Sequence, residues 1–178
     1  MAKTKWATVT GHEDLGNHIH RIHCVSDEPL NHVSGNYVIL RSTITNPEKP
    51  SDVIKRAYSI SSAPNKENPL EFDFTIIDVG IMSNWLAQRS VGDRLEFSGP
   101  WGKKFRAQPE DTATEIHLFA TGTGFSPIGS MALDRLYKEN ESVSIWWQTD
   151  VLYDQKTLEL LKENHNFSVR VGSKITAE

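Results

Sequence analysis

The last third of the sequence alternates between strand-like and helix-like segments, an order that few folds accept. Apolar, β-type segments at 115–120, 142–148 and 167–171 alternate with helix-like segments at 128–140 and 155–163. This β-α-β-α-β order is typical of a parallel, doubly wound sheet. A glycine-rich turn at 121–127 follows the first strand, where N–H groups at a helix start can approach a phosphate. A turn of this kind is also common where glycine serves only strand–helix packing.

The preceding residues have a different character, with short strand patterns separated by turn signals. Strands are expected at 5–10, 18–25, 37–40, 56–62, 70–77 and 91–98, with a loop at 46–52 and a tight turn at 99–102. A short helix is expected at 83–89, with Ser83 at or near its N-cap. This pattern predicts a small antiparallel β-barrel or sandwich. The expected domains are 1–110 and 111–178, joined through a polar linker at 109–114.

Composition excludes several classes of protein. The chain has 178 residues, 38% of them hydrophobic and 24% charged, which is enough for a sizeable core. Its net charge is −4 without a basic run, so no nucleic-acid surface is indicated. The single cysteine, Cys24, excludes an intrachain disulfide and a four-thiolate iron–sulfur cluster within this chain. No 18-residue apolar run is present, so we expect no membrane segment and a cytoplasmic location.

The most site-like stretch is 56–64, which reads Arg-Ala-Tyr-Ser-Ile-Ser-Ser-Ala-Pro. In an extended strand, Arg56, Tyr58 and Ile60 lie on one face. A guanidinium beside an aromatic ring suits a ligand with a flat ring at one end and a phosphate at the other. From these residues alone, the alternative is an edge strand with an exposed Arg and a half-buried Tyr.

Two further stretches invite a ligand. A glycine-led turn into a helix at 80–83 can bind an anion through free N–H groups, although the same pattern is common in ordinary helix capping. His18, His20, His23 and Cys24 fall within seven residues. A strand cannot aim all four side chains at one ion, so we expect solvated or capping histidines and no metal site.

The motifs occur in an order that resembles the ferredoxin–NADP(H) reductase family of flavoenzymes, in which an FAD-binding barrel precedes a nucleotide-binding domain. The resemblance covers nearly all of the chain. Residues 56–59 resemble the family's Arg-x-Tyr-Ser motif, and 80–86 its second flavin loop. The turns at 92–93 and 99–102 match the barrel-closing turns. The turn at 121–127 is similar to the Gly-Thr-Gly-x-x-Pro loop of the pyridine-nucleotide domain. The implied fold is an antiparallel, Greek-key-like β-barrel followed by an α/β domain.

The resemblance implies roles for individual residues. Arg56 would contact the flavin pyrophosphate, Tyr58 would stack on the isoalloxazine ring, and Ser59 would lie near flavin N5. Tyr58 and Ser59 are therefore the candidate catalytic residues. The remaining candidate cofactor-binding residues are Ala57, Phe74, Thr75, Ile76, Gly80, Ile81, Met82, Ser83, Thr121, Gly122, Thr123, Gly124, Pro127, Ser173 and Lys174. Among them, Ser173 and Lys174 stand where relatives grip the NADP 2′-phosphate.

The implied activity is hydride transfer between nicotinamide C4 and flavin N5, followed by one-electron steps with a ferredoxin or flavodoxin. FAD is expected ahead of FMN, with NADP(H) as the second cofactor. Relatives continue beyond the third strand of the second domain, whereas this sequence stops at Glu178. We therefore expect an incomplete α/β domain that binds NADP(H) less securely than the barrel binds FAD and is the more mobile or self-associating part. The alternatives are a flavin-binding electron-transfer or sensor module that does not use NAD(P)H, and a remnant without flavin.

Overall fold

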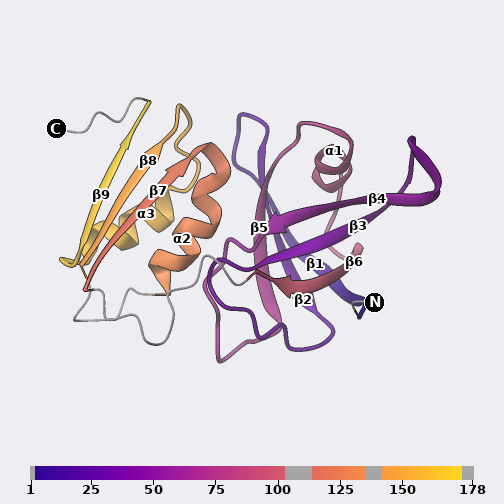
Figure 1. Cartoon of the computed structure of the whole chain (residues 1–178), viewed down its shortest axis with the longest axis horizontal. Coiled ribbons are helices and arrows are strands. Elements are labelled where there is room, and N and C mark those ends of the chain that lie inside the picture. The colour runs from indigo at the N-terminus through magenta and orange to yellow at the C-terminus, as the bar shows by residue number, and fades with distance from the viewer. Residues whose placement is uncertain (1–2, 103–113, 135–141, 174–178) are drawn as a thin grey trace.

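The chain folds into two units that lie side by side (Figure 1), in a computed structural model that describes residues 3–102, 114–134 and 142–173. The first unit contains β1 (Lys5–Asp14), β2 (Ile19–Ser26), β3 (Tyr37–Asn46), β4 (Lys49–Ser59), β5 (Glu71–Ile77), α1 (Ile81–Ala87) and β6 (Arg94–Trp101). The second contains β7 (Glu115–Thr121), the short 3₁₀ helix η1 (Gly122–Gly124), α2 (Phe125–Leu133), β8 (Ser142–Gln148), α3 (Gln155–Glu163) and β9 (Phe167–Gly172). The predicted order of fold types is confirmed. The predicted boundary between residues 110 and 111 lies outside the described residues and stays a prediction.

The six strands of the first unit form one antiparallel sheet in the order β4-β3-β6-β1-β2-β5. Its two outermost strands also meet. Ile60, just after β4, bridges Phe74 of β5, and the Ser61 N–H donates to the Asp73 carbonyl (2.8 Å). This contact closes the sheet, so the first unit is the predicted barrel and not a sandwich.

Alternating side chains give the barrel its core. Along β2, Ile22 and Cys24 are buried while His23 between them faces outward, as the two-residue period of a strand requires. Phe72, Phe74 and Phe97 are almost fully buried, and the ring centroids of Phe72 and Phe97 lie 5.5 Å apart. Three buried aromatic rings contribute a large share of the barrel's hydrophobic stabilisation.

The second unit is a parallel sheet in the order β7-β8-β9, with α2 and α3 packed on one face. Trp147 lies at the centre of that packing, stacked on Phe125 with ring centroids 4.1 Å apart and edge-on to Tyr153 at 5.0 Å. On the other face Phe119 and Trp146 stack on each other at 4.7 Å, and Phe119 is 68% exposed. Within the described ranges no helix covers this second face, and no helix is long and apolar enough to cross a membrane.

Three predictions of local structure are wrong. The loop predicted at 46–52 is largely a hairpin, because β4 already begins at Lys49; β4 is an edge strand, where Pro50 is tolerated. The turn predicted at 99–102 is mostly the end of β6, which continues through Trp101 with a cis bond between Gly99 and Pro100. The helix predicted from residue 128 begins earlier, at Phe125, and Pro127 fits its first turn because no N–H is needed there.

An ionic cluster ties three strands together on the outside of the barrel. His23 of β2 lies between Asp73 of β5 (Nδ1 to Oδ1, 2.8 Å) and Glu13 of β1 (Nε2 to Oε1, 3.1 Å). The hydrogen bond to Asp73 is the main reason why the pKa of His23 is raised, and the charges of both carboxylates add to it while partial burial opposes it.

This cluster predicts a pH dependence of stability. Because the pKa of His23 is higher in the folded than in the unfolded chain, its charged form stabilises the fold below about pH 6.5, and this contribution is lost as the pH rises through the folded pKa. Urea titrations should show a loss of about 0.5 kcal/mol in the free energy of unfolding, since partly exposed ion pairs contribute little. His23→Gln should remove this loss, whereas His165→Gln, at an exposed histidine between α3 and β9, should keep it. Equal pH profiles for all three proteins would contradict the prediction.

Candidate functional site

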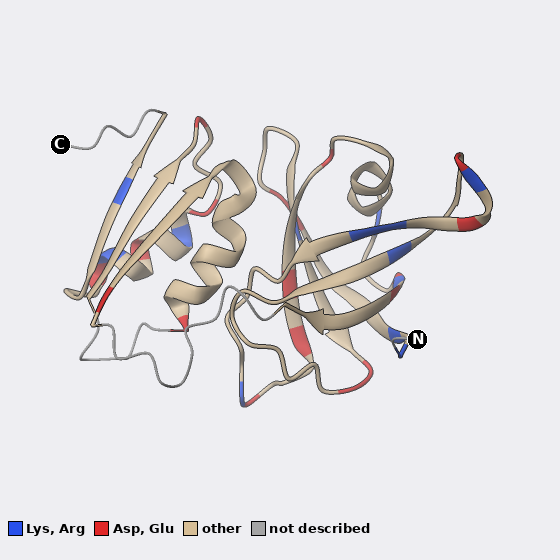
Figure 2. Ribbon diagram, in the orientation of Figure 1, with Lys and Arg blue, Asp and Glu red and all other residues tan. Residues whose placement is uncertain are grey.

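A pocket of about 440 Å³ opens between β4 and the start of α1, a size typical of small-molecule sites. Its lining residues are Ile54, Arg56, Ala57, Tyr58, Val79, Gly80, Ile81, Met82 and Ser83. Two stretches that are distant in the sequence, 56–58 and 80–83, therefore meet in one pocket. Figure 2 shows Lys and Arg along β3 and β4, on the strands that lead to it.

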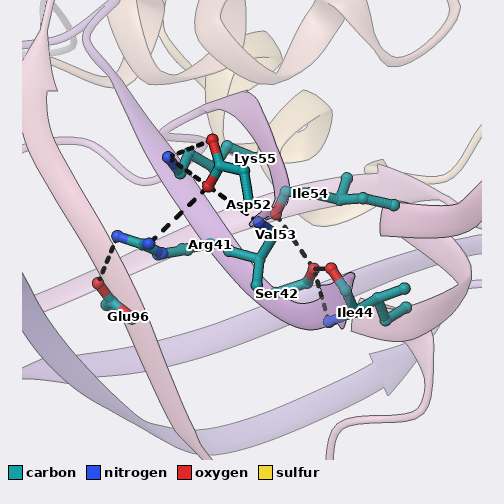
Figure 3. Close-up of polar contacts among 8 residues, drawn as sticks. All are labelled: Arg41, Ser42, Ile44, Asp52, Val53, Ile54, Lys55 and Glu96. Carbon is teal, nitrogen blue, oxygen red and sulfur yellow. Dashed lines mark hydrogen bonds and ion pairs between the residues drawn. The ribbon is translucent and has the colours of Figure 1, made fainter. Parts of the chain in front are cut away.

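The inner wall of the pocket comes from alternate residues of β4. Ile54 is buried in the barrel core, and Tyr58, on the same side of the strand, packs against that core. A bulge in the neighbouring strand β3 holds this arrangement (Figure 3). There the Ser42 hydroxyl donates to the Ile54 carbonyl (3.1 Å) and accepts from the Ile44 N–H (3.1 Å). The bulge thus anchors β4 two residues before Arg56.

Arg56 is the cation that the strand presents to the pocket. It is exposed, and its Nη1 donates to the Lys55 carbonyl (2.8 Å). The nearby cations are already paired: Lys55 Nζ lies 3.0 Å from Asp52 Oδ1, and Arg41 Nη1 lies 3.3 Å from Glu96 Oε1 (Figure 3). In the part of the chain that the structure describes, Arg56 has no carboxylate partner, so its charge is available to an anionic ligand.

Tyr58 joins the two sides of the pocket. Its ring is tilted against Phe74 with centroids 5.9 Å apart, and its hydroxyl shares a 3.1 Å hydrogen bond with the Ser83 hydroxyl of α1. Burial raises the pKa of Tyr58, while the hydrogen bond with Ser83 and the charge of Arg56 oppose this rise. The phenol therefore stays neutral near pH 7, in a fixed orientation.

The N-cap of α1 (Ile81–Ala87) is Gly80 and not Ser83, which corrects the prediction. Gly80 has φ 94° and ψ 166°, a conformation that side chains rarely tolerate. No side chain caps the helix, so the N–H groups of its first turn lack the partner that a capping residue gives. Ser83 lies inside the helix, where its hydroxyl reaches Tyr58.

The other predicted flavin contacts lie beside this pocket and do not line it. Phe74 and Ile76 are buried in the barrel core, so only their backbone can meet a ligand. Beyond the bridge at Phe74, the outer edge of β5 has no strand partner among the described residues. The Thr75 hydroxyl is buried without a hydrogen-bond partner within those ranges, and Ser59 ends β4 half-buried.

The predicted nucleotide residues belong to the second unit. Thr121 ends β7, the Gly122 to Gly124 turn is η1, and Pro127 lies in the first turn of α2. The η1 turn contacts β5 of the barrel. Thr123, the middle residue of η1, is half-buried. Ser173 follows β9, where its carbonyl accepts from Gln148 Nε2 (3.2 Å), and Lys174 lies outside the described residues.

The histidine cluster is spread over several partners. His20 Nδ1 lies 3.1 Å from His12 Nε2, and His18 Nδ1 lies 2.9 Å from Asp78 Oδ1. His23 belongs to the ionic cluster on the other face. Among the described residues, no three side chains are grouped as metal ligands.

Two pocket residues were missed by sequence reasoning. Val79 is 75% exposed and lies at the mouth of the pocket next to Gly80, and Ile54 forms its inner wall. The two-residue period of β4 could have indicated Ile54, since it precedes Arg56 on the same face. An exposed valine in a loop has no comparable signal.

Comparison with known proteins identifies the family. Residues 8–105 match the oxidoreductase FAD-binding domain. The chain belongs to this family. The matched range includes the whole pocket between β4 and α1, so FAD is the cofactor type associated with this part of the fold.

Relatives extend the comparison into the second unit. One component of the Na⁺-translocating NADH-quinone reductase of Pseudomonas aeruginosa is 28% identical over 133 residues, covering 67% of this chain and 32% of that protein. The phenol hydroxylase P5 protein of Acinetobacter pittii is 29% identical, covering 90% of this chain and 45% of that protein. The cytochrome b5 reductase domain of Ulva prolifera nitrate reductase has the same fold, with a TM-score of 0.77 at 20% identity, over 95% of this chain and 73% of that one. The chain thus spans 32% and 45% of the length of these two curated relatives.

The conformation of Gly80 predicts that alanine destabilises the protein more at this position than at Gly124. Gly80→Ala should lower the free energy of unfolding by about 1–3 kcal/mol, because its φ is strained for any residue with a Cβ. Gly124→Ala is the matched control, since Gly124 has φ −59° and an added Cβ there meets nothing within 4 Å. That change should alter stability by less than about 1 kcal/mol. Equal losses in urea titrations of the two variants would show that backbone strain at Gly80 is not the cause.

Proposed function

We propose that this chain binds FAD in the pocket between β4 and α1 and moves electrons between NADP(H) and a small redox partner, a ferredoxin or flavodoxin. The observation that carries the proposal is the meeting of Arg56, Tyr58 and the 80–83 turn in one pocket. Membership of the FAD-binding family supports the cofactor. NADH is the competing electron donor, because one relative is named as part of an NADH-quinone reductase.

The residues present fit a flavin dinucleotide. Tyr58 supplies a flat ring, Arg56 a cation for the pyrophosphate, and the uncapped first turn of α1 supplies N–H donors. The buried hydroxyls of Ser61 and Thr75 have no hydrogen-bond partner in the described ranges. Since buried polar groups are almost always satisfied, these hydroxyls support a polar ligand next to β4 and β5.

FAD, when bound, supplies hydride and one-electron chemistry that side chains lack. The protein's own part is to hold, orient and shield that group. Arg56 neutralises the pyrophosphate charge, and Tyr58, fixed between Phe74 and Ser83, presents its ring and a neutral hydroxyl. Ser59, which the family resemblance places near flavin N5, follows Tyr58 at the end of β4 and is half-buried.

The second cofactor has a weaker site. The Gly122 to Gly124 turn offers N–H groups at the start of α2, and Ser173 lies at the end of β9. The turn at 121–127 contains no Lys or Arg, whereas Arg56 lines the first pocket. We therefore expect FAD to bind more tightly than NADP(H).

The absorbance spectrum of the purified protein tests the proposed function. A yellow protein with about one FAD per chain, bleached anaerobically by NADPH faster than by NADH, is the expected result, and the reduced protein should then reduce a ferredoxin or flavodoxin. A yellow protein that neither nucleotide bleaches would contradict the nucleotide step and favour an electron-transfer or sensor module. A colourless protein that does not take up added FAD would contradict the proposal as a whole.

Arg56→Ala tests the anion contact. Loss of a charge-assisted hydrogen bond should weaken FAD binding by about 2 kcal/mol, or roughly thirtyfold in Kd. Arg41→Ala is the matched control, because Arg41 pairs with Glu96 on the outer face of the barrel. Calorimetric titration of the FAD-free protein measures both. Equal affinities for FAD in the two variants would sink the assignment of Arg56.

Ser59→Ala tests the second predicted catalytic residue. The variant should keep its FAD but be reduced by NAD(P)H about tenfold more slowly, because a contact made mainly in the transition state is removed. Ser90→Ala, in the exposed loop between α1 and β6, serves as the control. Loss of FAD with an unchanged reduction rate per bound FAD would assign Ser59 to binding instead.

A further inference from the structure

Polar contacts join the second unit to the barrel in two regions. At one, on α2, the Ser130 hydroxyl donates to the Ser62 carbonyl (2.8 Å), and the Ser34 hydroxyl of the barrel donates to Asp134 Oδ2 at the end of α2 (2.5 Å). At the other, Arg21 of β2 forms an ion pair with Asp154, which immediately precedes α3 (2.9 Å). Ile19, at the start of β2, belongs to the hydrophobic core of the second unit. The position of the second unit on the barrel thus depends on these polar contacts, on the packing of Ile19 and on the contact between η1 and β5.

Among the residues that the structure describes, the ion pair between Arg21 and Asp154 is much more buried than the other Arg–carboxylate pairs. The side chain of Arg21 is 16% exposed and that of Asp154 is 8% exposed. Burial opposes the charge of Arg21, but Asp154, Glu13 and Asp73 together outweigh it, so the pKa of Arg21 is raised. Removing one member of such a pair leaves an uncompensated charge in a low-dielectric site, which is strongly unfavourable.

A continuous chain of contacts leads from this pair to the glycine turn. Asp154 follows Tyr153, whose buried ring stands edge-on to Trp147 at an interplanar angle of 82°. The indole N–H of Trp147 donates to the carbonyl of Gly122, the first residue of η1 (2.8 Å). Because these groups are closely packed, a shift of one of them displaces the next.

We propose that Arg21 and Asp154 are positioning residues, whose ion pair fixes the Gly122 to Gly124 turn against the barrel. The structural part of this inference stands on the contacts alone. Its consequence for catalysis rests on the proposed function: if the turn holds the nucleotide, loss of the pair should slow reduction of bound FAD. A misplacement of about 1 Å costs roughly a hundredfold in rate.

Amide hydrogen exchange of the whole chain tests the structural part without any need for activity. In Arg21→Met, exchange at residues 122–125 and 155–159 should rise at least about tenfold, while exchange in β3 and β6 should stay unchanged. Arg94→Met is the matched control, because Arg94 pairs with Asp27 at an exposed site within the barrel. If Arg21→Met does not fold, Asp154→Asn makes the same test from the other side.

A double-variant cycle identifies the pair itself as the cause. Arg21→Met/Asp154→Asn should exchange no faster at 122–125 than either single variant, because no unpaired charge is left. Reduction of bound FAD by NAD(P)H should slow in Arg21→Met at unchanged FAD occupancy, and Arg21→Lys should recover part of the rate.

The outcomes separate the two proposals. Unchanged exchange at 122–125 in both single variants, or effects that simply add in the double variant, would overturn the positioning role. If the Arg94→Met control binds FAD but no nucleotide reduces it, the proposed function fails, and the exchange data still decide whether the pair positions the turn.

Discussion

A sheet closes into a barrel only where its two outermost strands meet. Here β4 and β5 meet at the bridge between Ile60 and Phe74. Both residues are fully buried, so the closure is held by the core and not by the hydrogen-bond ladder alone. The closure fixes the end of β4 against β5. Tyr58, two residues earlier, is thereby placed against the Phe74 ring, within reach of Ser83 on α1. The pocket is a consequence of how the barrel shuts.

Much of this site could be predicted from the sequence, because its residues come from two short stretches, 56–58 and 80–83. The two-residue period of a strand was enough to place Arg56 and Tyr58 on one side of β4. The start of α1 was mispredicted because a serine is the usual N-cap signal, whereas here the backbone turn depends on Gly80 and Ser83 is free to bond Tyr58. The hairpin at 46–52 was missed because proline suggests a loop unless a strand is known to lie at an edge, which only the sheet order reveals.

The contacts between the units could not be read from the sequence. Arg21 and Asp154 are 133 positions apart in the sequence, and no residue near either of them indicates the other as its partner. Arg21 even lies on the solvent-facing side of its strand pattern, where an arginine is expected without a partner. The apolar pattern of 142–148 predicted β8 correctly, but it could not show that Trp147 would bond the carbonyl of Gly122. Long-range polar contacts appear only when the fold brings the elements together.

The neighbouring residues Trp146 and Trp147 point to opposite faces of the second sheet. Trp147 is fully buried beneath α2 and α3, while Trp146 stacks on the exposed Phe119. Two consecutive residues therefore have indoles in different environments. A dissolved quencher such as iodide can reach the ring of Trp146 far more easily than the ring of Trp147. The buried indole donates its N–H to the Gly122 carbonyl, so a change at the glycine turn alters the contribution of Trp147 to the emission of the five tryptophans. The second unit thus carries its own optical label for the region where a nucleotide would lie.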